Sequence, residues 1–565
     1  MRRGGQVLTE IKHGGHILEE DSARAAAMAD QQESITLAAD AVGEVLFETP
    51  FDYLLLDLKS DPEAHLPASD PSATVAALNA LGEAMVENAL AQGEDPLQPT
   101  GNATIPPVYT YWGQFIDHDL TANTDRNSKI SDITASDLAP LDPDFVVANL
   151  KNLRQPTLNL DSVYGDGPTF DASNPTQAGS FYDGIKLKVG TVATNPNTPP
   201  IAGDPIPPDE DLQRDLPRID KTAQIADARN DENLIIAQLH TAYLRFHNAV
   251  VDWVIANEGS YSSDEQRFER ARQLTRWHYQ WLVVHDYLKT VSLSGIPDKI
   301  LLSGPKHYAP RDGVAYMPLE FSVAAYRFGH TMVRAAYDHN RNFGRPGKVI
   351  ANAPFDLLFA FTGNGNPPFP APGTTDTLPF NWIIEWDRFV HKGSSFPDHF
   401  ARKIDTRLAP PLHAMVNEGN NVPDVDIRTI LKNLARRNLL RGYLLSIPTG
   451  QSVAEAMGVI PLSAEELQQG NNDALNQVLA DNGFLEKTPL WYYVLKEAEV
   501  CANGNSLGEL GSRIVCETII GQLLHDPDSY LNQAGGWNPG QGVKLPNGDP
   551  IVTIGDFLSF AGLIV

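Results

Sequence analysis

The sequence DENLIIAQLHTAYLRFHNAVVDWVIA, residues 231–256, shows most clearly how this chain folds. Its apolar side chains recur every three or four residues, at Leu234, Ile235, Leu239, Ala242, Tyr243, Phe246, Val250, Val251 and Val254. This spacing is typical of an α-helix that buries one face. Similar patterns predict helices over residues 265–291, 319–337, 425–445 and 490–524, whereas long strands with strict alternation are hard to find. The chain is therefore predicted to be mainly α-helical, with little β structure.

Connections rich in Pro and Gly separate the predicted helices, at residues 195–217, 363–375 and 526–550. Proline lacks a backbone N–H and biases the preceding residue away from the helical region, so these stretches are predicted to be long surface loops. Residues 1–44 show weak periodicity and are predicted to form a poorly ordered arm. Residues 45–565, which contain no internal repeat, are predicted to form one large helical domain.

The net charge limits the partners of the chain. Its 565 residues include 43 Lys and Arg against 71 Asp and Glu, which gives a formal net charge of −28. Such a charge repels phosphate backbones, and no run of Lys and Arg supplies a basic patch, so nucleic-acid binding is not expected. The apolar fraction of 42% favours a globular chain over wholesale disorder.

Neither a signal peptide nor a membrane span is predicted. Residues 1–5 carry the positive charge of a secretory leader, but no apolar stretch of about seven or more residues follows them. A run of roughly 18 apolar residues, as a spanning helix needs, occurs nowhere in the chain. The two cysteines, Cys501 and Cys516, are too few for a disulfide scaffold or a Cys-rich metal site. Whether they pair or stay reduced is left open.

The first stretch with candidate chemistry is YWGQFIDHDLT, residues 111–121. On a helix, Gln114, Asp117 and His118 fall at i, i+3 and i+4 and project from one face, where they would share a cavity. Asp119 is turned about 100° from His118, and there its carboxylate can hold a hard cation. A solvated polar face is the ordinary interpretation of such a cluster, but the aromatic and aliphatic neighbours argue against full solvation.

The second stretch is YRFGHTMVR, residues 326–334. His330 has Arg327 and Arg334 one turn to either side, and a buried imidazole flanked by cations loses its own proton easily. Such an imidazole suits a neutral metal ligand, and the arginines can meet carboxylates, including those of a cofactor. Gly329 would let a flat group approach the backbone closely. The competing interpretation is a histidine that is satisfied within the core.

Two shorter motifs contain further polar groups. Arg229 lies at the start of a predicted helix, where a cation is disfavoured unless an anionic or oxidising group needs it. Asp231 and Glu232 beside it are ordinary complements to the helix dipole. Asn438 and Arg441 lie at i and i+3, so an amide and a guanidinium share one helical face.

Five sequence blocks, in this order, resemble the animal-type haem peroxidase superfamily, which includes myeloperoxidase, lactoperoxidase, peroxidasin and bacterial relatives. They are WGQFIDHD (112–119), DSVYG (161–165), RNDE (229–232), RFGH (327–330) and NLLR (438–441). The general resemblance extends over about 45–560, and PLWYY (489–493) resembles bacterial members in particular. The resemblance implies a single large helical haem peroxidase domain that holds haem b.

The resemblance also assigns roles to individual residues. It makes His118 the distal histidine, Gln114 an amide of the distal pocket and Arg229 the distal arginine. His330 would be the proximal ligand of the haem iron, and Asn438 would accept the other ring N–H of His330, which raises the basicity of that ligand. His118 would move a proton between the oxygens of hydrogen peroxide, while Arg229 would stabilise the charge that develops as the O–O bond breaks.

Further roles follow for the groups around the haem. Arg327 and Arg441 match positions near the haem propionates. Asp117 and Glu232 match the carboxylates that form ester bonds to haem methyl groups in mammalian members, and whether these esters form here is left open. The implied electron donors are small organic molecules or halides. The family also implies a response to oxidative stress and an extracellular location, although the sequence shows no recognisable signal peptide.

A calcium ion is implied between Asp119 and the loop over residues 155–161. Its oxygen ligands would be Asp119, Asp161, the amide oxygen of Asn159 and the carbonyl of Thr157. Gln155 and Asn159 depart from the Thr and Asp that are common at these positions. The competing interpretation is a loop in which Asn and Asp form turn hydrogen bonds.

Other departures from the family pattern narrow the function. Asn233 follows Glu232 in place of Met, so the sulfonium link to haem of myeloperoxidase is not expected. Cyclooxygenases place a radical tyrosine three residues before the proximal histidine, where this chain has Arg327. A fatty-acid oxygenase similar to the α-dioxygenases is therefore only the first alternative to a peroxidase. A haem-binding or adhesive module without turnover is the second alternative. A zinc hydrolase is disfavoured because no His-x-x-x-His pair occurs.

Overall fold

The computed structural model describes most of the chain from residue 49 onward. The described residues are 49–87, 101–124, 132–165, 167–168, 170, 181–193, 211–219, 221–344, 350–351, 353–363, 377–390, 400–416, 418–420 and 422–564. The predicted arm, residues 1–44, lies outside them, and so do most of the predicted loops 195–217 and 363–375. The third predicted loop, 526–550, is described and contains only two short 3-10 helices, η10 (Tyr530–Asn532) and η11 (Pro539–Gln541).

Helices dominate the structure, and this confirms the predicted mainly α fold. About 51% of the structure is helical and 8% is strand. The longer helices are α3 (Pro71–Ala84), α4 (Val108–Leu120), α7 (Leu234–Asn257), α8 (Asp264–Leu282), α13 (Leu434–Leu444), α17 (Leu490–Ala502) and α18 (Glu509–His525). The shorter ones are α2 (Leu56–Lys59), α5 (Pro143–Asn149), α6 (Asp161–Tyr164), α9 (Leu288–Val291), α10 (Ile296–Ser303), α11 (Pro410–His413), α12 (Val425–Lys432), α14 (Gly450–Ala456), α15 (Ala464–Gln468), α16 (Asp473–Asp481) and α19 (Ile554–Phe560).

The helix expected over residues 231–256 is α7, and it is more deeply buried than its periodicity predicts. The Asn233 side chain caps it by accepting a hydrogen bond from the backbone N–H of Ile236. Every residue from 234 to 244 is buried, and only the second half of the helix exposes one face. The prediction of one buried face was therefore wrong for the first half, because α4, α8 and the 3-10 helix η4 (Ala228–Asp231) pack around that half.

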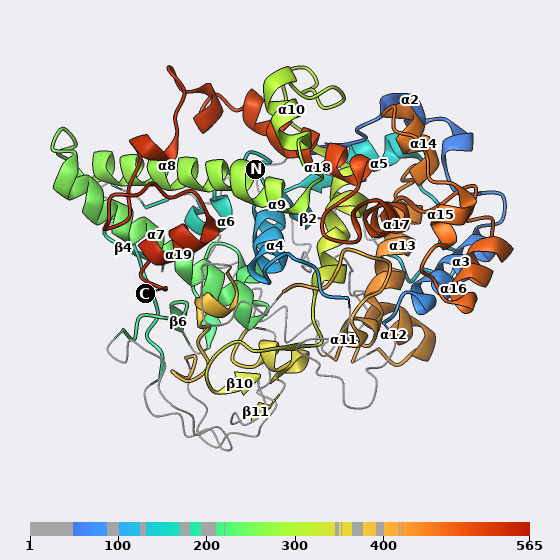
Figure 1. Ribbon diagram of the computed structural model, residues 1–565, viewed down its shortest axis with the longest axis horizontal. Coiled ribbons are helices and arrows are strands. Elements are labelled where there is room, and N and C mark those ends of the chain that lie inside the picture. The colour runs from blue at the N-terminus through green and yellow to red at the C-terminus, as the bar shows by residue number, and fades with distance from the viewer. Residues whose placement is uncertain are drawn as a thin grey trace, which may run out of the picture.

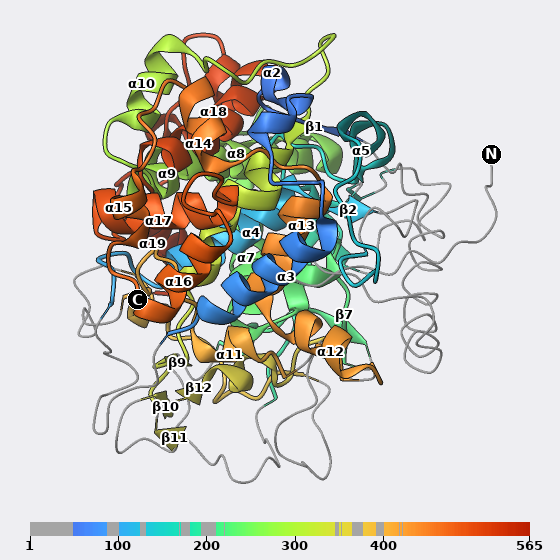
Figure 2. The ribbon, with the colours of Figure 1, turned by 90° about the vertical axis from the view of Figure 1, so that its right-hand side faces the viewer.

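Helix α4 lies in the middle of the molecule (Figure 1). It packs against α7 on one side and against the 3-10 helix η7 (Ala325–Met332) on the other. Helix α17 packs against η7 and α13, and α3 packs over α13 (Figure 2). The elements α4 and η7 therefore lie between the α7/α8 pair and the group formed by α3, α13 and α17.

Three of the predicted helices are interrupted. The stretch 319–337 forms a π-helix, η6 (Glu320–Ala324), then η7, and then the strand β9 (Ala336–Tyr337). The backbone leaves helical geometry at Ala324, with φ −127° and ψ −76°. The stretch 425–445 divides at Asn433, whose side chain caps α13. The stretch 490–524 divides after α17, where Asn503 takes a positive φ of 50°. Apolar spacing continues across such breaks, so it cannot reveal them.

Strands are short, with two to four residues each. One sheet has the order β2-β3-β1-β8, in which β1 pairs antiparallel with β3 and parallel with β8. Its register places Thr49 opposite Asn152 and Phe51 opposite Met317. The strands of this sheet are β1 (Thr49–Asp52), β2 (Asn123–Thr124), β3 (Lys151–Asn152) and β8 (Met317–Pro318). The two-stranded pairs are β4 (Tyr182–Asp183) with β5 (Lys186–Leu187), β6 (Arg218–Ile219) with β7 (Thr222–Ala223), β9 with β12 (Ala353–Pro354), and β10 (Phe343–Gly344) with β11 (Ile350–Ala351).

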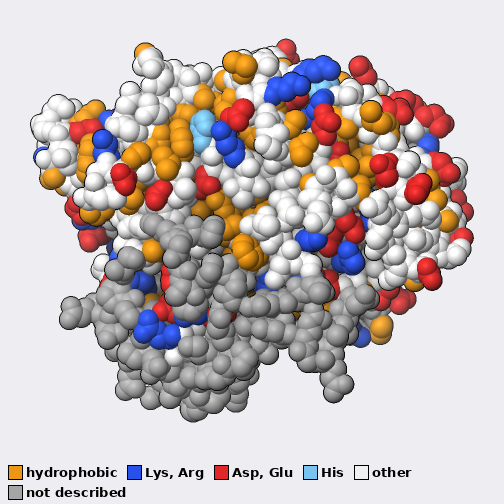
Figure 3. Space-filling view, viewed as in Figure 1, with side chains coloured by type: hydrophobic (Ala, Val, Ile, Leu, Met, Phe, Trp, Pro, Cys, Tyr) orange, Lys and Arg blue, Asp and Glu red, His pale blue; other side chains and the backbone are white. Residues whose placement is uncertain are grey.

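Several features of the chain bear on the sequence predictions. Both cysteines are free, Cys501 exposed and Cys516 buried, which settles the open question of their pairing. Among the described residues, no helix combines the length and the hydropathy that a membrane crossing requires. Acidic side chains are spread along the right-hand side of the face shown in Figure 3.

Candidate functional site

Helix α4 and the 3-10 helix η7 are mostly buried, but candidate site residues on both of them are partly accessible. Helix α4 is buried along its length except at Gln114 and Asp117. On η7, Arg327, Gly329 and His330 are partly accessible, while the flanking residues are buried. The two elements pack against each other inside the molecule, and we call the region around these partly accessible residues the interior space. The structure thus brings residues of the two predicted motifs to one place.

On the α4 side of this space, Gln114 and His118 meet Glu232. The amide nitrogen of Gln114 donates a hydrogen bond to Oε1 of Glu232. The same oxygen lies 3.7 Å from Nε2 of His118. Asn233 donates from Nδ2 to Oε1 of Gln114 at 3.3 Å. The amide, carboxylate and imidazole groups of the first and third motifs therefore share one cluster, as the resemblance implies.

His118 also contacts a residue that the sequence analysis did not select. Its Nδ1 lies 2.9 Å from Oδ1 of Asn230, and both side chains are buried. Because an amide oxygen only accepts, this orientation of Asn230 requires Nδ1 of His118 to carry a proton. Residues 118 and 230 are 112 positions apart, and no spacing rule in the sequence connects them.

Arg229 is held in place by Asp227. Its Nε and Nη2 donate to the two carboxylate oxygens of Asp227 at 3.1 and 2.7 Å, and Nη2 also donates to the backbone carbonyl of His118 at 2.8 Å. Burial raises the pKa of Asp227, but the guanidinium groups of Arg229 and Arg154 outweigh it and hold that pKa well below its ordinary value. Asp227 is thus the anionic partner that the cation of Arg229 requires just before α7. No pattern in the sequence had identified this carboxylate.

On the η7 side, His330 contacts Asn438 of α13. The amide nitrogen Nδ2 of Asn438 lies 2.9 Å from Nδ1 of His330, while its oxygen accepts from Nη1 of Arg327 at 2.9 Å. The pairing of His330 with Asn438 matches the resemblance, but the amide presents its nitrogen and not its oxygen. Trp491 of α17 donates to the carbonyl of Arg327 at 3.2 Å, and its ring lies 6.5 Å from that of His330.

Three arginines, Arg327, Arg437 and Arg441, lie close together near the carboxylate of Asp117. Burial lowers the pKa of Arg327 to about 10, opposed by Asp117 and reinforced by Arg441 and Arg437. Burial raises the pKa of Asp117, although Arg229 and Arg327 oppose that shift. Arg441 of α13 is fully buried. Buried cations so close together favour the binding of an anionic group near Arg327.

The loop predicted to bind calcium brings two carboxylates together. Asp119 is fully buried and accepts from Oγ of Ser162 at 2.9 Å and from the backbone N–H of Leu160 at 3.2 Å. Burial raises the pKa of Asp161 to about 7, with Arg154 opposing and Asp119 adding to the shift. Oδ1 of Asp161 is buried and accepts no hydrogen bond within the described residues.

The other predicted calcium ligands are engaged in hydrogen bonds. Oδ1 of Asn159 accepts from the backbone N–H of Asp161 at 3.0 Å, and its Nδ2 donates to Gln155 at 2.8 Å. The carbonyl of Thr157 accepts from Gln280 at 3.2 Å. Within the described chain, no three His, Cys, Asp or Glu side chains gather as a metal site.

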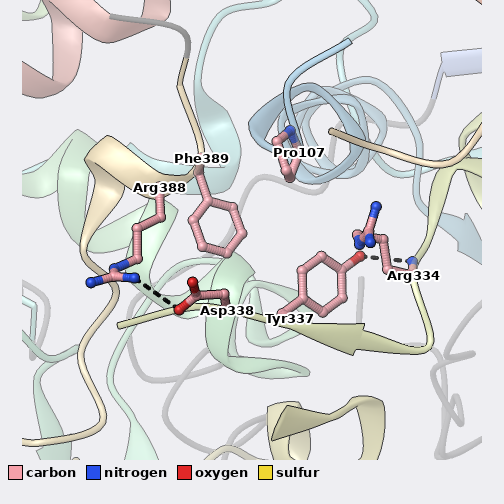
Figure 4. A pocket seen from close by; sticks show the side chains of 6 residues that line it. All are labelled: Pro107, Arg334, Tyr337, Asp338, Arg388 and Phe389. Atoms are coloured by element: carbon pink, nitrogen blue, oxygen red, sulfur yellow. Dashed lines mark hydrogen bonds and ion pairs between the residues drawn. The ribbon is translucent and has the colours of Figure 1, made fainter. Parts of the chain in front are cut away.

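A small pocket lies near the N-terminal end of α4 (Figure 4). Its lining residues are Pro107, Arg334, Tyr337, Asp338, Arg388 and Phe389. Arg388 forms a buried ion pair with Asp338 at 2.8 Å, and the backbone N–H of Arg334 donates to the hydroxyl of Tyr337 at 3.0 Å. Nη1 of Arg334 donates to Asn102 and to the carbonyl of Phe400. Arg334 therefore lines this pocket, whereas Arg327 contacts the amide beside His330.

A family model connects part of the chain with known enzymes. Residues 158–354 match the model of the family "Animal haem peroxidase". This segment contains Arg229, Glu232, Arg327 and His330. Peroxidase mlt-7 of Caenorhabditis elegans is 25% identical over 249 residues, which are 40% of this chain and 33% of that protein. The match thus spans about a third of the length of that relative.

Solved structures share the fold across most of the chain. Peroxidase A from Dictyostelium discoideum matches with a TM-score of 0.56 and 16% identity, over 89% of this chain and 95% of that one. The fatty acid alpha-dioxygenase of Oryza sativa matches with a TM-score of 0.51 and 13% identity, over 85% of this chain and 74% of that one. At these identities the likeness establishes the fold alone.

Proposed function

Because the chain carries an animal haem peroxidase domain, we propose that it is a haem-dependent peroxidase that reduces hydrogen peroxide and oxidises small organic or halide donors. The observation that carries this proposal is the placement of the two ring nitrogens of His118. Its Nδ1 lies 2.9 Å from the amide oxygen of Asn230, and its Nε2 lies 3.7 Å from the carboxylate of Glu232. An imidazole that is held through Nδ1 in a buried site is suited to transfer a proton at Nε2.

The residue types around the interior space fit haem b, although the amide of Asn438 would have to turn for His330 to bind the iron. His330 would hold the iron, and Arg327 and Arg441 would hold the propionates, whose negative charge would offset the buried guanidinium groups. No heavy atom lies within 4 Å of the place where a Cβ of Gly329 would stand, which leaves room beside the backbone for a flat group. When bound, haem supplies the redox chemistry that breaks the O–O bond of the peroxide.

The protein contributes proton transfer and positioning. Nε2 of His118 takes the proton from one peroxide oxygen and delivers it to the other, so that water leaves. Arg229 stabilises the negative charge on the departing oxygen, and its ion pair with Asp227 fixes the guanidinium for that task. Gln114 orients Glu232 through their hydrogen bond.

The proposal includes two modifications of the site that the resemblance implies. Asp117 and Glu232 would form ester bonds to haem methyl groups, which is supported by their carboxylates lying at the same space as Gln114 and His118. Calcium would bind at Asp119, Thr157, Asn159 and Asp161, which is supported by the buried carboxylate of Asp119 beside the partly buried one of Asp161, whose Oδ1 lies 3.7 Å from Arg154 and accepts no hydrogen bond among the described residues. The loop would have to exchange the hydrogen bonds of Thr157 and Asn159 for bonds to the ion. An extracellular role in the response to oxidative stress rests on the resemblance.

A fatty-acid oxygenase is the second candidate, since the fold is also that of a fatty acid alpha-dioxygenase. That chemistry needs a radical tyrosine beside the haem, and Arg327 stands at the matching position. Tyr326 stacks on Phe321 at 4.5 Å and lies beside Tyr287. A haem-binding module without turnover is a third candidate, and it gives no reason for the pairing of His118 with Arg229 and Asp227.

One experiment separates these candidates. The chain is reconstituted with haem, and its absorption spectrum is recorded before and after addition of hydrogen peroxide. A Soret band that changes with peroxide and returns when a phenol is added supports the peroxidase. Uptake of oxygen on a fatty acid would indicate the oxygenase, and a Soret band that does not respond would indicate the binding module. Absence of a Soret band overturns all three.

A further inference from the structure

We propose that His240 and Asn230 together select the tautomer of His118, so that His240 is a positioning residue of the distal site. We call the chain of contacts from His240 through Asn230 to His118 the distal relay. The state of the imidazole is inferred from the contacts of these three side chains alone, while its meaning for catalysis rests on the proposed peroxidase function.

The distal relay consists of two hydrogen bonds in a fully enclosed place. Oδ1 of Asn230 lies 2.9 Å from Nδ1 of His118, and Nδ2 of Asn230 lies 2.9 Å from Nδ1 of His240. Asn230 and His240 have no exposed surface, and 5% of His118 is exposed. Asn230 belongs to η4 and His240 to α7, so the relay joins the start of α7 to α4.

The amide of Asn230 transmits the state of one imidazole to the other. One end of an amide only accepts hydrogen bonds and the other end only donates them. As long as Nδ1 of His240 accepts from Nδ2, the oxygen faces His118, and Nδ1 of His118 must carry the proton. If Nδ1 of His240 donated instead, the amide would turn, its nitrogen would face His118, and the proton of His118 would move to Nε2. That tautomer has no lone pair with which to take a proton from peroxide.

The accepting state of His240 requires a neutral ring that carries its proton on Nε2. Burial lowers the pKa of His240 to about 4, so the ring is neutral at neutral pH, and Asp227 opposes this shift. A neutral imidazole carries one proton, which then resides on Nε2. Within the described residues, Nε2 of His240 has no hydrogen-bond partner, and the ring packs against the edge of Phe115 with centroids 6.3 Å apart.

The observed orientation also suits the protonated form of His118. After His118 has taken a proton on Nε2, its Nδ1 still carries a hydrogen and still donates to Oδ1 of Asn230. Asn230 therefore needs no rearrangement between the two states of His118, provided that His240 continues to accept from Nδ2. A base that cycles between these states without reorientation of its neighbours incurs no reorganisation cost during the reaction.

The test begins with the haem-free chain, labelled with nitrogen-15 in its histidines. Nitrogen chemical shifts distinguish protonated from unprotonated ring nitrogens, and His118→Ala identifies the signals of His118. In the wild-type chain His118 should carry its proton on Nδ1. His240→Leu should shift His118 toward a mixture of tautomers, whereas His240→Gln, which can accept through its amide oxygen, should keep most of the wild-type state. An Nε2–H form in the wild type, or unchanged signals in His240→Leu, overturns the proposal.

A rescue variant separates positioning from general packing. A carboxylate at position 230 can accept from His118 without help from His240, so the double variant Asn230→Asp with His240→Leu should restore the Nδ1–H form. His247→Leu is the matched control, because His247 lies on the same helix and is equally buried. It should leave the tautomer of His118 unchanged, and a double variant that behaves like His240→Leu alone would contradict the relay.

Ligand binding to the haem-loaded protein gives a second measurement. Hydrogen cyanide must lose its proton when it binds ferric haem, whereas nitric oxide has no proton to lose. His240→Leu should slow cyanide association about tenfold or more and leave nitric oxide association within about twofold. Equal slowing of both ligands would indicate a distorted pocket and contradict the relay. Failure of the wild type to bind haem would refute the proposed function, and the tautomer measurement would still decide the relay.

Discussion

Asn438 presents its amide nitrogen to Nδ1 of His330 at 2.9 Å, because its oxygen is taken by Arg327. On the opposite side of the space, Asn230 presents its oxygen to His118. The two candidate histidines are therefore held by amides of opposite orientation. An iron ligand that binds through Nε2 needs its proton on Nδ1, so haem binding requires the amide of Asn438 to turn and Arg327 to move.

The first prediction concerns this amide. Asn438→Asp places a group that only accepts beside His330, which should make the ring a stronger electron donor and lower the Fe(III)/Fe(II) midpoint potential of the haem-loaded protein. Asn438→Leu should raise it, because the ring N–H then has no acceptor. Spectroelectrochemical titration measures both. Equal potentials in the two variants would show that the amide does not act on the iron ligand.

The second prediction concerns the distal base. His118→Ala should retain haem while the reaction with hydrogen peroxide slows by about 100-fold or more, since general base catalysis contributes roughly that factor. Stopped-flow absorbance at the Soret band measures the rate. The control is His413→Ala. His413 lies on α11, where it pairs with Glu83 and does not belong to the candidate site. A rate near that of the wild type would refute the role of His118.

The third prediction concerns the anchor of Arg229. Asp227→Asn removes the buried carboxylate that the partly buried guanidinium groups of Arg154 and Arg229 share, which should lower the free energy of unfolding by about 3 kcal/mol. It should also slow the peroxide reaction more than it weakens haem binding. Urea denaturation and stopped-flow measurements test these effects.

Asp264→Asn is the matched control for that ion pair. Asp264 is exposed and lies 3.3 Å from Arg267, so its removal should change stability by less than about 1 kcal/mol. Equal effects of the two substitutions would show that burial of the Asp227 ion pair does not matter.

The fourth prediction concerns calcium. Added calcium should raise the melting temperature, because an ion that binds only the native state at 100 times its Kd contributes about 2.7 kcal/mol. Magnesium should have a smaller effect, since it prefers a rigid octahedral site. Asp161→Asn should abolish the dependence on calcium. Differential scanning calorimetry with and without a chelator measures it, and an unchanged melting temperature would count against the site.

The fifth prediction concerns pH and Glu497. This buried carboxylate accepts from the backbone N–H groups of Leu510 and Gly511 at the start of α18, and burial raises its pKa to about 7. Since the folded-state pKa lies above that of the unfolded chain, the native state binds more protons over the range between them. The contribution of Glu497 to stability is therefore largest in acid and falls as the pH rises toward about 7.

Replacement of Glu497 tests that dependence. Glu497→Gln should flatten the decline in the free energy of unfolding between about pH 5 and pH 7, as measured by urea denaturation at each pH. Glu465→Gln, at an exposed position of α15, should leave the decline unchanged. A decline of equal size in Glu497→Gln and in the wild type would contradict the assignment.

The amino-acid sequence predicts the local structure of this protein. Spacing of apolar residues predicted the helix now seen as α7, and positions i, i+3 and i+4 placed Gln114, Asp117 and His118 on one helix. These inferences hold because the helical repeat fixes which side chains within one element are neighbours. The same spacing could not reveal the breaks at Ala324 and Asn433, since both elements of each interrupted stretch bury apolar residues.

How the site is completed depends on the folded structure. It placed Asn230 against His118, and it turned the amide nitrogen of Asn438 toward His330. Contacts between residues more than a hundred positions apart depend on how α4, η4, η7 and α13 pack, and periodicity within one element carries no information about that packing. A polar residue such as Asn230 is common at the start of a helix, whether or not it contacts a distant residue. Its role can therefore be assigned only when the hydrogen-bond donors and acceptors around it are known.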